Sequence, residues 1–250
     1  MTHKKVVLIT GASRGIGAAT ALLAAEQGWV VAVNYVANSL AADDVVRQIR
    51  AVGGTAMAIQ ADVAVEADVI RMFQEVDAKF GRICGLVNNA GVVDMPSRVD
   101  AMSVERLTRM WTTNITSSFV CAREAVKRMS TKLGGEGGSI VNLSSAAARL
   151  GSPGQYVDYA ASKAAIDAFT IGLAKEVALE GIRVNAVRPG IIDTDIHASG
   201  GLPDRAAQVA PLVPMQRAGT AHEVAEAIVW LLSDDSSYST GSFIDVTGGR

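Results

Sequence analysis

Short apolar runs recur along the chain and predict its strands. Seven runs are rich in β-branched or aliphatic residues, at positions 6–10, 30–34, 56–61, 83–88, 139–143, 182–187 and 243–246. They lack the polar and apolar alternation of a half-exposed sheet. A parallel strand covered by helices is buried on both faces and needs this near-continuous hydrophobicity. We therefore predict seven strands of a mostly parallel sheet.

Segments with helical patterning separate these runs, at 15–27, 39–52, 66–80, 103–132, 157–180 and 221–233. In the last segment, apolar residues recur every three or four positions, and Thr220 with Glu223 offers a capping box. Strands that alternate with helices predict a doubly wound, Rossmann-type α/β fold with helices on both faces of the sheet. In such folds ligands bind beyond the carboxyl ends of the strands, so functional residues are expected just after strands.

No repeat or Pro/Ser-rich linker divides the chain, so we predict a single domain, 1–250, for cofactor binding and catalysis together. The segment 193–219 is the exception within it. It holds Pro203, Pro211 and Pro214 and has only short helical stretches. A long segment with little regular structure is typically a lid, and here we predict one over the substrate site.

Composition narrows the function classes. Hydrophobic residues make up 49% of the chain and charged residues 19%, which excludes a disordered protein. The net charge of −2 offers no basic surplus for nucleic acid or an acidic membrane, so we expect a small-molecule partner. Cys84 and Cys121 lack metal-ligand spacing, and no metal site is predicted. Without a signal peptide or a membrane-spanning stretch, we expect a cytoplasmic location.

A glycine-rich turn joins the first strand to the first helix. Its sequence is TGASRGIG over 10–17, and its candidate phosphate-binding residues are Gly11, Ser13, Arg14, Gly15, Ile16 and Gly17. Glycines let the backbone approach a pyrophosphate, and the free N–H groups of the helix start attract its charge. The turn is not a P-loop, because no Gly-Lys-Ser/Thr follows. Taken alone, it is also compatible with an ordinary tight connection.

The end of the second strand bears on the choice of dinucleotide. NAD-binding folds usually place a carboxylate there for the ribose 2′-hydroxyl, and this chain has Asn34 followed by Tyr35. Without that carboxylate a 2′-phosphate is not repelled, and the Arg14 guanidinium can pair with it. We favour NADP(H) as the cofactor. NAD(H) stays open because no second basic residue follows the strand, and Arg14 can also be a solvated loop charge.

Tyr159 and Lys163 stand four residues apart in the segment 157–180, hence on one face of a helix. Reducing a carbonyl by hydride leaves an alkoxide that must be protonated, and a phenol is a candidate acid. Lowering its pKa from about 10 to about 7 takes about 4 kcal/mol. One ammonium about 4 Å away supplies that much at an effective dielectric of about 20. We therefore predict that Lys163 lowers the pKa of Tyr159.

Three further polar residues accompany this pair. Ser144 and Ser145 end a buried strand, and Asn114 lies within the segment 103–132. A serine hydroxyl can donate to the substrate oxygen as negative charge develops on it. Without these companions, Tyr159 and Lys163 are also compatible with a surface contact on a helix.

Together these motifs resemble those of the short-chain dehydrogenase/reductase family in its single-domain form, from residue 6 to the C-terminus. The residues that carry the resemblance are Thr10-Gly11-x-x-x-Gly15-x-Gly17, Asp62-Val63, Asn88-Asn89-Ala90-Gly91, Asn114, Ser145, Tyr159-x-x-x-Lys163, Pro189-Gly190, Thr194 and Tyr238-x-Thr240-Gly241. The runs 140–159 and 187–190 also resemble a bacterial subgroup known only as oxidoreductases.

The resemblance implies a role for each catalytic candidate. Tyr159 would be the general acid/base, Lys163 would lower its pKa and hold the ribose hydroxyls, and Asn114 would fix a water that relays protons. Ser145 would orient the carbonyl. Ser144 is the alternative serine, because Ser145 stands one residue further from Tyr159 than is usual in the family.

The resemblance also implies a cofactor site and an assembly. Asp62 and Val63 would contact adenine, and Ile192 and Thr194 the carboxamide of the nicotinamide. The other expected contacts are Asn34, Asn89, Ala90, Gly91, Pro189 and Gly190. A homotetramer is implied, with helices 103–132 and 157–180 pairing between subunits and the tail near 243–249 in a further contact.

The predicted function is an NADP(H)-dependent oxidoreductase that interconverts an alcohol with a ketone or aldehyde. A non-catalytic NADP(H)-binding sensor and a methyltransferase that binds S-adenosylmethionine are the alternatives. Arg149 and His197 are candidates for a polar substrate, although solvated loop positions suit them better.

Overall fold

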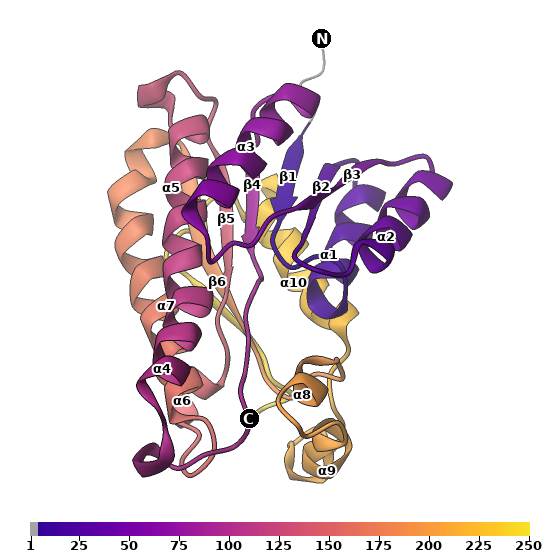
Figure 1. Cartoon of the computed structure of the whole chain (residues 1–250). Coiled ribbons are helices and arrows are strands. Elements are labelled where there is room, and N and C mark those ends of the chain that lie inside the picture. The colour runs from indigo at the N-terminus through magenta and orange to yellow at the C-terminus, as the bar shows by residue number, and fades with distance from the viewer. Residues whose placement is uncertain (1–4) are drawn as a thin grey trace.

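The computed structural model describes residues 5–250, apart from the side chains of His197 and Ser199, and contains a sheet of seven parallel strands (Figure 1). The strand order is β3-β2-β1-β4-β5-β6-β7, so the direction of winding reverses between β1 and β4. The strands are β1 (Val6–Ile9), β2 (Val30–Tyr35), β3 (Thr55–Gln60), β4 (Gly85–Asn88), β5 (Gly138–Leu143), β6 (Ile182–Pro189) and β7 (Phe243–Val246). The predicted Rossmann-type fold is confirmed.

Helices cover both faces of the sheet. Their bounds are α1 (Gly15–Glu26), α2 (Ser39–Ala51), α3 (Glu66–Phe80), α4 (Val104–Trp111), α5 (Ser117–Met129), α6 (Ala147–Leu150), α7 (Val157–Val177), α8 (Ile196–Ser199), α9 (Arg205–Val209) and α10 (Ala221–Leu232). Core residues of α1, α2 and α10 pack on one face, and those of α3, α5 and α7 on the other. Successive strand side chains point to opposite faces, so Val7 joins the first core and Leu8 the second.

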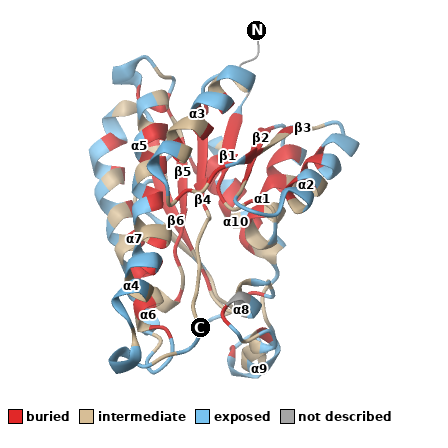
Figure 2. Cartoon of the chain, viewed as in Figure 1, coloured by how far each residue is buried: buried red, intermediate tan, exposed pale blue. Residues whose placement is uncertain are grey.

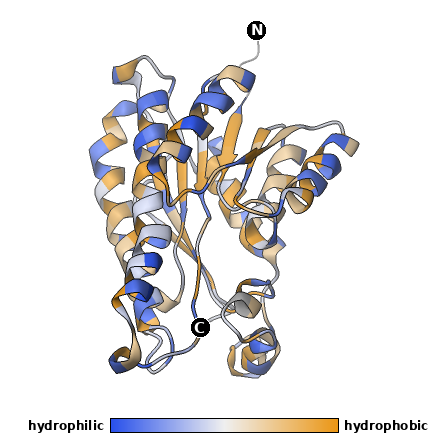
Figure 3. Cartoon of the chain, in the orientation of Figure 1, coloured by the Kyte–Doolittle hydropathy of each residue, from blue (hydrophilic) through white to orange (hydrophobic). Residues whose placement is uncertain are grey.

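Burial follows the hydrophobic pattern of the sequence. The strands form the buried centre in Figure 2, and Figure 3 shows apolar strands inside helices whose outer faces carry hydrophilic residues. The capping box of α10 is present as predicted. Thr220 Oγ1 accepts from the Glu223 N–H at 3.2 Å, and the Glu223 carboxylate accepts from the Thr220 N–H at 2.8 Å.

The segment predicted as one helix over 103–132 is divided. Between α4 and α5 lies a single π turn, Thr112–Thr116, which contains Asn114. A π turn carries an extra residue and commonly marks a functional position in a helix. The sequence pattern missed this break.

The segment 193–219 contains α8, α9 and a 3₁₀ turn (Ala210–Leu212), and it lies beside the carboxyl ends of the strands (Figure 1). Its short helices agree with the sequence, and its function as a lid stays a prediction. Among the helices of the described residues, none has both the length and the apolar character of a membrane span.

Candidate active site

The glycine turn after β1 is built for close backbone approach. Gly11 and Gly15 have φ of +60° and +54°, a region that favours glycine. A Cβ at Gly17 would lie 2.5 Å from both the Gly11 carbonyl oxygen and Asn89 Nδ2. Asn89 Nδ2 donates to the carbonyls of Thr10 and Gly11 at 2.8 and 2.9 Å. The asparagine thus holds the turn against the end of β4.

Two further polar side chains shape this turn from inside. Thr10 Oγ1 accepts from the N–H groups of Asn89 and Ala90, both at 3.0 Å. Asn34 is fully buried, and its Oδ1 accepts from the Gly11 N–H at 3.1 Å. The Asn34 amide also donates to backbone carbonyls at the end of β3. Asn34 therefore supports the turn from behind, and its contact with a cofactor stays a prediction.

Tyr159 and Lys163 lie one turn apart in α7 and line one cavity, as the spacing predicts. The Lys163 Nζ is 5.7 Å from the centre of the Tyr159 ring. It donates to the Leu143 carbonyl at 2.6 Å, and the lysine is only 5% exposed. The ammonium is therefore fixed between the end of β5 and the phenol.

Burial dominates the titration of both groups. It raises the pKa of Tyr159 above its ordinary 10, and a hydrogen bond with Ser145 opposes this rise. Burial also lowers the pKa of Lys163 to about 8, against the charge of Asp167. The expected lowering of the Tyr159 pKa by Lys163 is thus not what the protein alone shows, because desolvation penalises both ions. At neutral pH the phenol keeps the proton that an acid must donate.

The structure separates the two candidate serines. Both serines line the cavity, and the Ser145 side chain shares a hydrogen bond with Tyr159. Ser144 is buried at the end of β5, and its hydroxyl donates to the Lys163 carbonyl of α7 at 3.1 Å. Ser145 is therefore the serine beside the phenol, and Ser144 joins the strand to the helix.

Asn114 lies in the π turn and is buried beside Lys163. Its Oδ1 accepts from the Val92 N–H at 2.8 Å, and its Nδ2 donates to the Val92 carbonyl at 2.9 Å. A Cβ at Gly91 would lie 3.4 Å from Asn114 Oδ1 and 3.6 Å from Lys163 Nζ. Asn114 and Lys163 therefore both lie beside Gly91, which has no side chain to separate them, and the role of Asn114 in holding a water stays a prediction.

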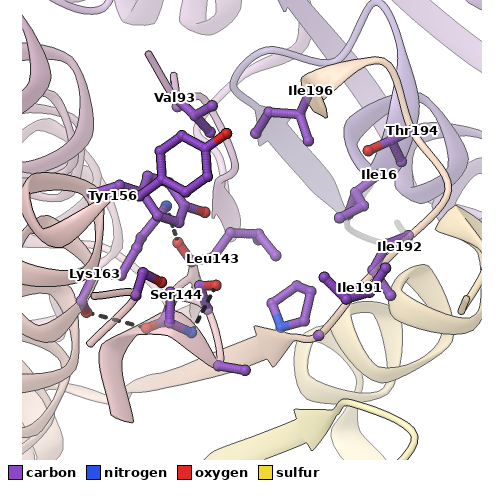
Figure 4. Close-up of a pocket in the computed structure, with 18 of the residues that line it drawn as sticks. Ile16, Val93, Leu143, Ser144, Tyr156, Lys163, Ile191, Ile192, Thr194 and Ile196 are labelled. Atoms are coloured by element: carbon purple, nitrogen blue, oxygen red, sulfur yellow. Dashed lines mark hydrogen bonds between the residues drawn. The ribbon is translucent and has the colours of Figure 1, made fainter. Parts of the chain in front are cut away.

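The cavity has a volume of about 180 Å³ and opens at the carboxyl ends of the strands. In Figure 4, Ser144 and Lys163 lie on one side and Ile16, Ile191, Ile192 and Thr194 on the other. Seven predicted cofactor residues line it besides Tyr159 and Lys163, namely Ile16, Asn89, Gly91, Pro189, Gly190, Ile192 and Thr194. The remaining candidates lie outside its lining, in the turn or near the ends of β2, β3 and β4: Gly11, Ser13, Arg14, Gly15, Gly17, Asn34, Asp62, Val63 and Ala90.

Sequence reasoning missed several lining residues. Leu150 and Tyr156 come from α6 and the start of α7, Arg205 from α9, and Arg250 from the C-terminus. No periodicity or spacing marks these positions. Arg149 pairs with Asp245 at 3.2 Å instead of lining the cavity, and the His197 side chain lies outside the described residues. Within the described part of the chain, no three His, Cys, Asp or Glu side chains gather as metal ligands do.

Comparisons with known proteins agree with this geometry. A family model described as enoyl-(acyl carrier protein) reductase matches residues 11–250. The solved structure of a mutant of a Serratia marcescens short-chain dehydrogenase/reductase aligns with this chain at a TM-score of 0.90 and 32% sequence identity. The alignment covers 100% of this chain and 99% of the Serratia protein. The chain belongs to the short-chain dehydrogenase/reductase family. This chain is an oxidoreductase that acts on carbonyl or CH–OH groups.

Sequence relatives within the family point the same way. The chain is 56% identical to the uncharacterized oxidoreductase YgfF of Escherichia coli over 98% of this chain and 99% of that protein. It is 41% identical to a 3-oxoacyl-[acyl-carrier-protein] reductase of Synechocystis, covering 98% and 96% of the two chains. The corresponding reductase of Staphylococcus aureus is 39% identical, covering 100% and 99%. The resemblance predicted from the motifs is confirmed.

Proposed function

We propose that this short-chain dehydrogenase/reductase uses NADP(H) to interconvert an alcohol with a ketone or aldehyde, with Tyr159 as the general acid/base. One observation carries the proposal. Tyr159 shares a hydrogen bond with Ser145 and lies beside the buried Lys163, in a cavity at the ends of the central strands. In doubly wound sheets, ligands bind at this point of reversal.

The residues fit a dinucleotide. Gly11 and Gly17 leave a cradle that a Cβ would fill, at the N-terminus of α1 where N–H groups favour a pyrophosphate. Arg14 occupies the N-cap position of this helix, and β2 ends without a carboxylate, which favours NADP(H) over NAD(H). When bound, the reduced nicotinamide supplies the hydride. Ile192 and Thr194 would hold its carboxamide, and Asp62 and Val63 its adenine.

The side chains on the other wall would handle the proton. Ser145 donates to the substrate oxygen and favours its negative charge. Tyr159 then gives its proton to that oxygen. Lys163, as an ammonium, stabilises the phenolate that remains, and Asn114, which lies beside Gly91 and Lys163, would hold a water that returns a proton through Lys163. In alcohol oxidation each proton moves the other way.

The structure also supports the expected homotetramer. The helices α4, α5 and α7 each leave a large apolar side chain exposed: Trp111 is 43% exposed, Phe119 47% and Ile171 41%. Exposed aromatic and aliphatic side chains of this kind are typical of subunit contacts. Sedimentation as a monomer at micromolar concentration would contradict this assembly. The single domain, the lid at 193–219 and the cytoplasmic location remain part of the proposal.

A panel of carbonyls and alcohols, each with NADPH or NADH and their oxidised forms, tests the function. A 3-oxoacyl thioester belongs in this panel because relatives are named for that group. We expect turnover that prefers the phosphorylated cofactor and a preference that weakens in Arg14→Gln. Cofactor binding without turnover of any substrate would favour a sensor, and a thermal shift with S-adenosylmethionine alone would favour a methyltransferase.

A further inference from the structure

Asp158 directly precedes Tyr159 in the first turn of α7, and its carboxylate is completely buried. A buried carboxylate is costly unless it is paired and hydrogen-bonded. The partner is Arg106 of α4, which is 11% exposed. Its Nε donates to Asp158 Oδ2 at 2.7 Å and its Nη2 to Oδ1 at 3.2 Å. Two parallel hydrogen bonds fix the carboxylate in its plane as well as its position.

The same guanidinium has a third partner. Arg106 Nη1 donates to the Met95 carbonyl at 2.6 Å, in the loop that follows β4. Val93 of this loop lines the cavity, and Asn114 holds its first part through Val92. Arg106 therefore joins three segments: α4, the turn of α7 that carries Tyr159, and a wall of the substrate cavity.

Neither Arg106 nor Asp158 lines the cavity. We infer that Arg106 and Asp158 are a positioning pair. Together they fix the orientation of Tyr159, and each cancels the charge of the other beside it. This inference rests on the proposed role of Tyr159 as acid/base. Arg106 and Asp158 act through Tyr159 and touch no reacting atom.

Charge cancellation has a signature that a purely structural contact lacks. Removing the cation of Arg106 leaves a buried anion next to Tyr159, which disfavours the phenolate and raises the Tyr159 pKa. Removing the charge of Asp158 leaves a buried cation, which lowers that pKa. Other charged or titratable groups near this corner remain in every variant: Lys163 on α7, Asp94 and Arg109 on the loop and α4, Arg205 on α9, and Tyr156 before α7.

The experiment compares Arg106→Gln, Asp158→Asn and the double variant in the full-length protein with NADP⁺ bound. Tyrosinate absorbance is titrated against pH, and the same titration of each variant combined with Tyr159→Phe isolates the signal of Tyr159, because the Arg106 charge also acts on Tyr156. We expect opposite shifts of about one pH unit in the two single variants and a pKa close to wild type in the double variant. In the single variants kcat for NADPH-dependent reduction should fall at least about tenfold.

A remote pair provides the matched control. Arg128 Nε donates to Asp77 Oδ2 at 2.7 Å, between α5 and α3. Arg128→Gln and Asp77→Asn remove a similar partly buried contact and should leave the Tyr159 titration unchanged. Arg106→Lys keeps the cation without the fork, so it should keep the wild-type pKa and lower kcat. This variant decides the question if Arg106→Gln fails to fold.

The outcomes separate this inference from the proposed function. Equal or same-sign pKa shifts in the two single variants, or an Arg106→Lys enzyme with wild-type kcat, would overturn the positioning pair while leaving the reductase intact. A wild-type enzyme that binds NADPH and reduces no carbonyl would overturn the function instead. The titration needs no substrate, so it tests the charge balance beside Tyr159 even if no carbonyl is reduced.

Discussion

The charge of Asp167 should set the pH at which Lys163 loses its proton. Asp167 follows Lys163 by one helical turn, and its Oδ2 accepts from Arg188 Nε and Nη2 at 3.0 and 2.9 Å. Its Oδ1 is buried without a hydrogen-bond partner among the described residues. Burial lowers the pKa of Lys163 to about 8, and the Asp167 carboxylate opposes this effect. In Asp167→Asn burial acts unopposed, so the Lys163 pKa should fall further.

The size of the effect follows from Coulomb's law. Charges about 6 Å apart, as expected one turn apart on a helix, interact by about 2.8 kcal/mol at an effective dielectric of about 20, equivalent to about two pH units. The Arg188 guanidinium cancels part of this interaction. We therefore expect the Lys163 pKa in Asp167→Asn to lie about one unit below that of the wild type.

The assay is the pH dependence of kcat for carbonyl reduction. Activity should fall as the pH rises through the Lys163 pKa, near about 8 in the wild type and about one unit lower in Asp167→Asn. Asp77→Asn is the control, because Asp77 also pairs with an arginine and also has a buried Oδ1 without a partner in the described chain. Coincident alkaline limbs for wild type and Asp167→Asn, or an equal shift in Asp77→Asn, would refute the reasoning.

Three other outcomes follow from the structure. Gly17→Ala should weaken NADPH binding by about a hundredfold or more in a fluorescence titration, because its Cβ would lie 2.5 Å from two polar atoms of the turn; wild-type affinity would exclude the predicted cradle. Burial raises the pKa of Tyr159, and carbonyl reduction needs the protonated phenol, so at neutral pH the enzyme should reduce faster than it oxidises. The initial rate of alcohol oxidation should grow as the pH rises, and an oxidation rate insensitive to pH would contradict this. Thr220→Ala removes the α10 capping box and should cost about 1 kcal/mol, or about 2–4 °C in the melting temperature by calorimetry, and an unchanged value would show that the cap contributes nothing.

Buried strands and the glycine turn could be predicted because their signals are local. A continuous apolar run such as Val6–Ile9 predicts a strand covered on both faces, and all four residues of this run are buried. The four-residue spacing of Tyr159 and Lys163 places both on one helix face by geometry alone. These elements needed no knowledge of distant contacts.

Other features depend on contacts between distant segments. The π turn at Thr112–Thr116 places Asn114 beside Lys163, and no local pattern encodes its extra residue. The titration of Tyr159 depends on how completely the surrounding elements bury it, so a pairwise argument with Lys163 gave the wrong direction for the protein alone. Arg205 reaches the cavity from a segment without periodicity. Structure was required for each of these.

The role of Tyr159 is tested most directly by a single turnover. Enzyme with bound NADPH is mixed with the best carbonyl of the panel, and the absorbance of the reduced nicotinamide reports hydride transfer. Tyr159→Phe should slow this step by about a thousandfold or more while NADPH affinity stays unchanged, whereas Tyr156→Phe, which alters another phenol lining the same cavity, should react at close to the wild-type rate. Equal rates for Tyr159→Phe and the wild type would contradict the assignment of Tyr159 as the acid.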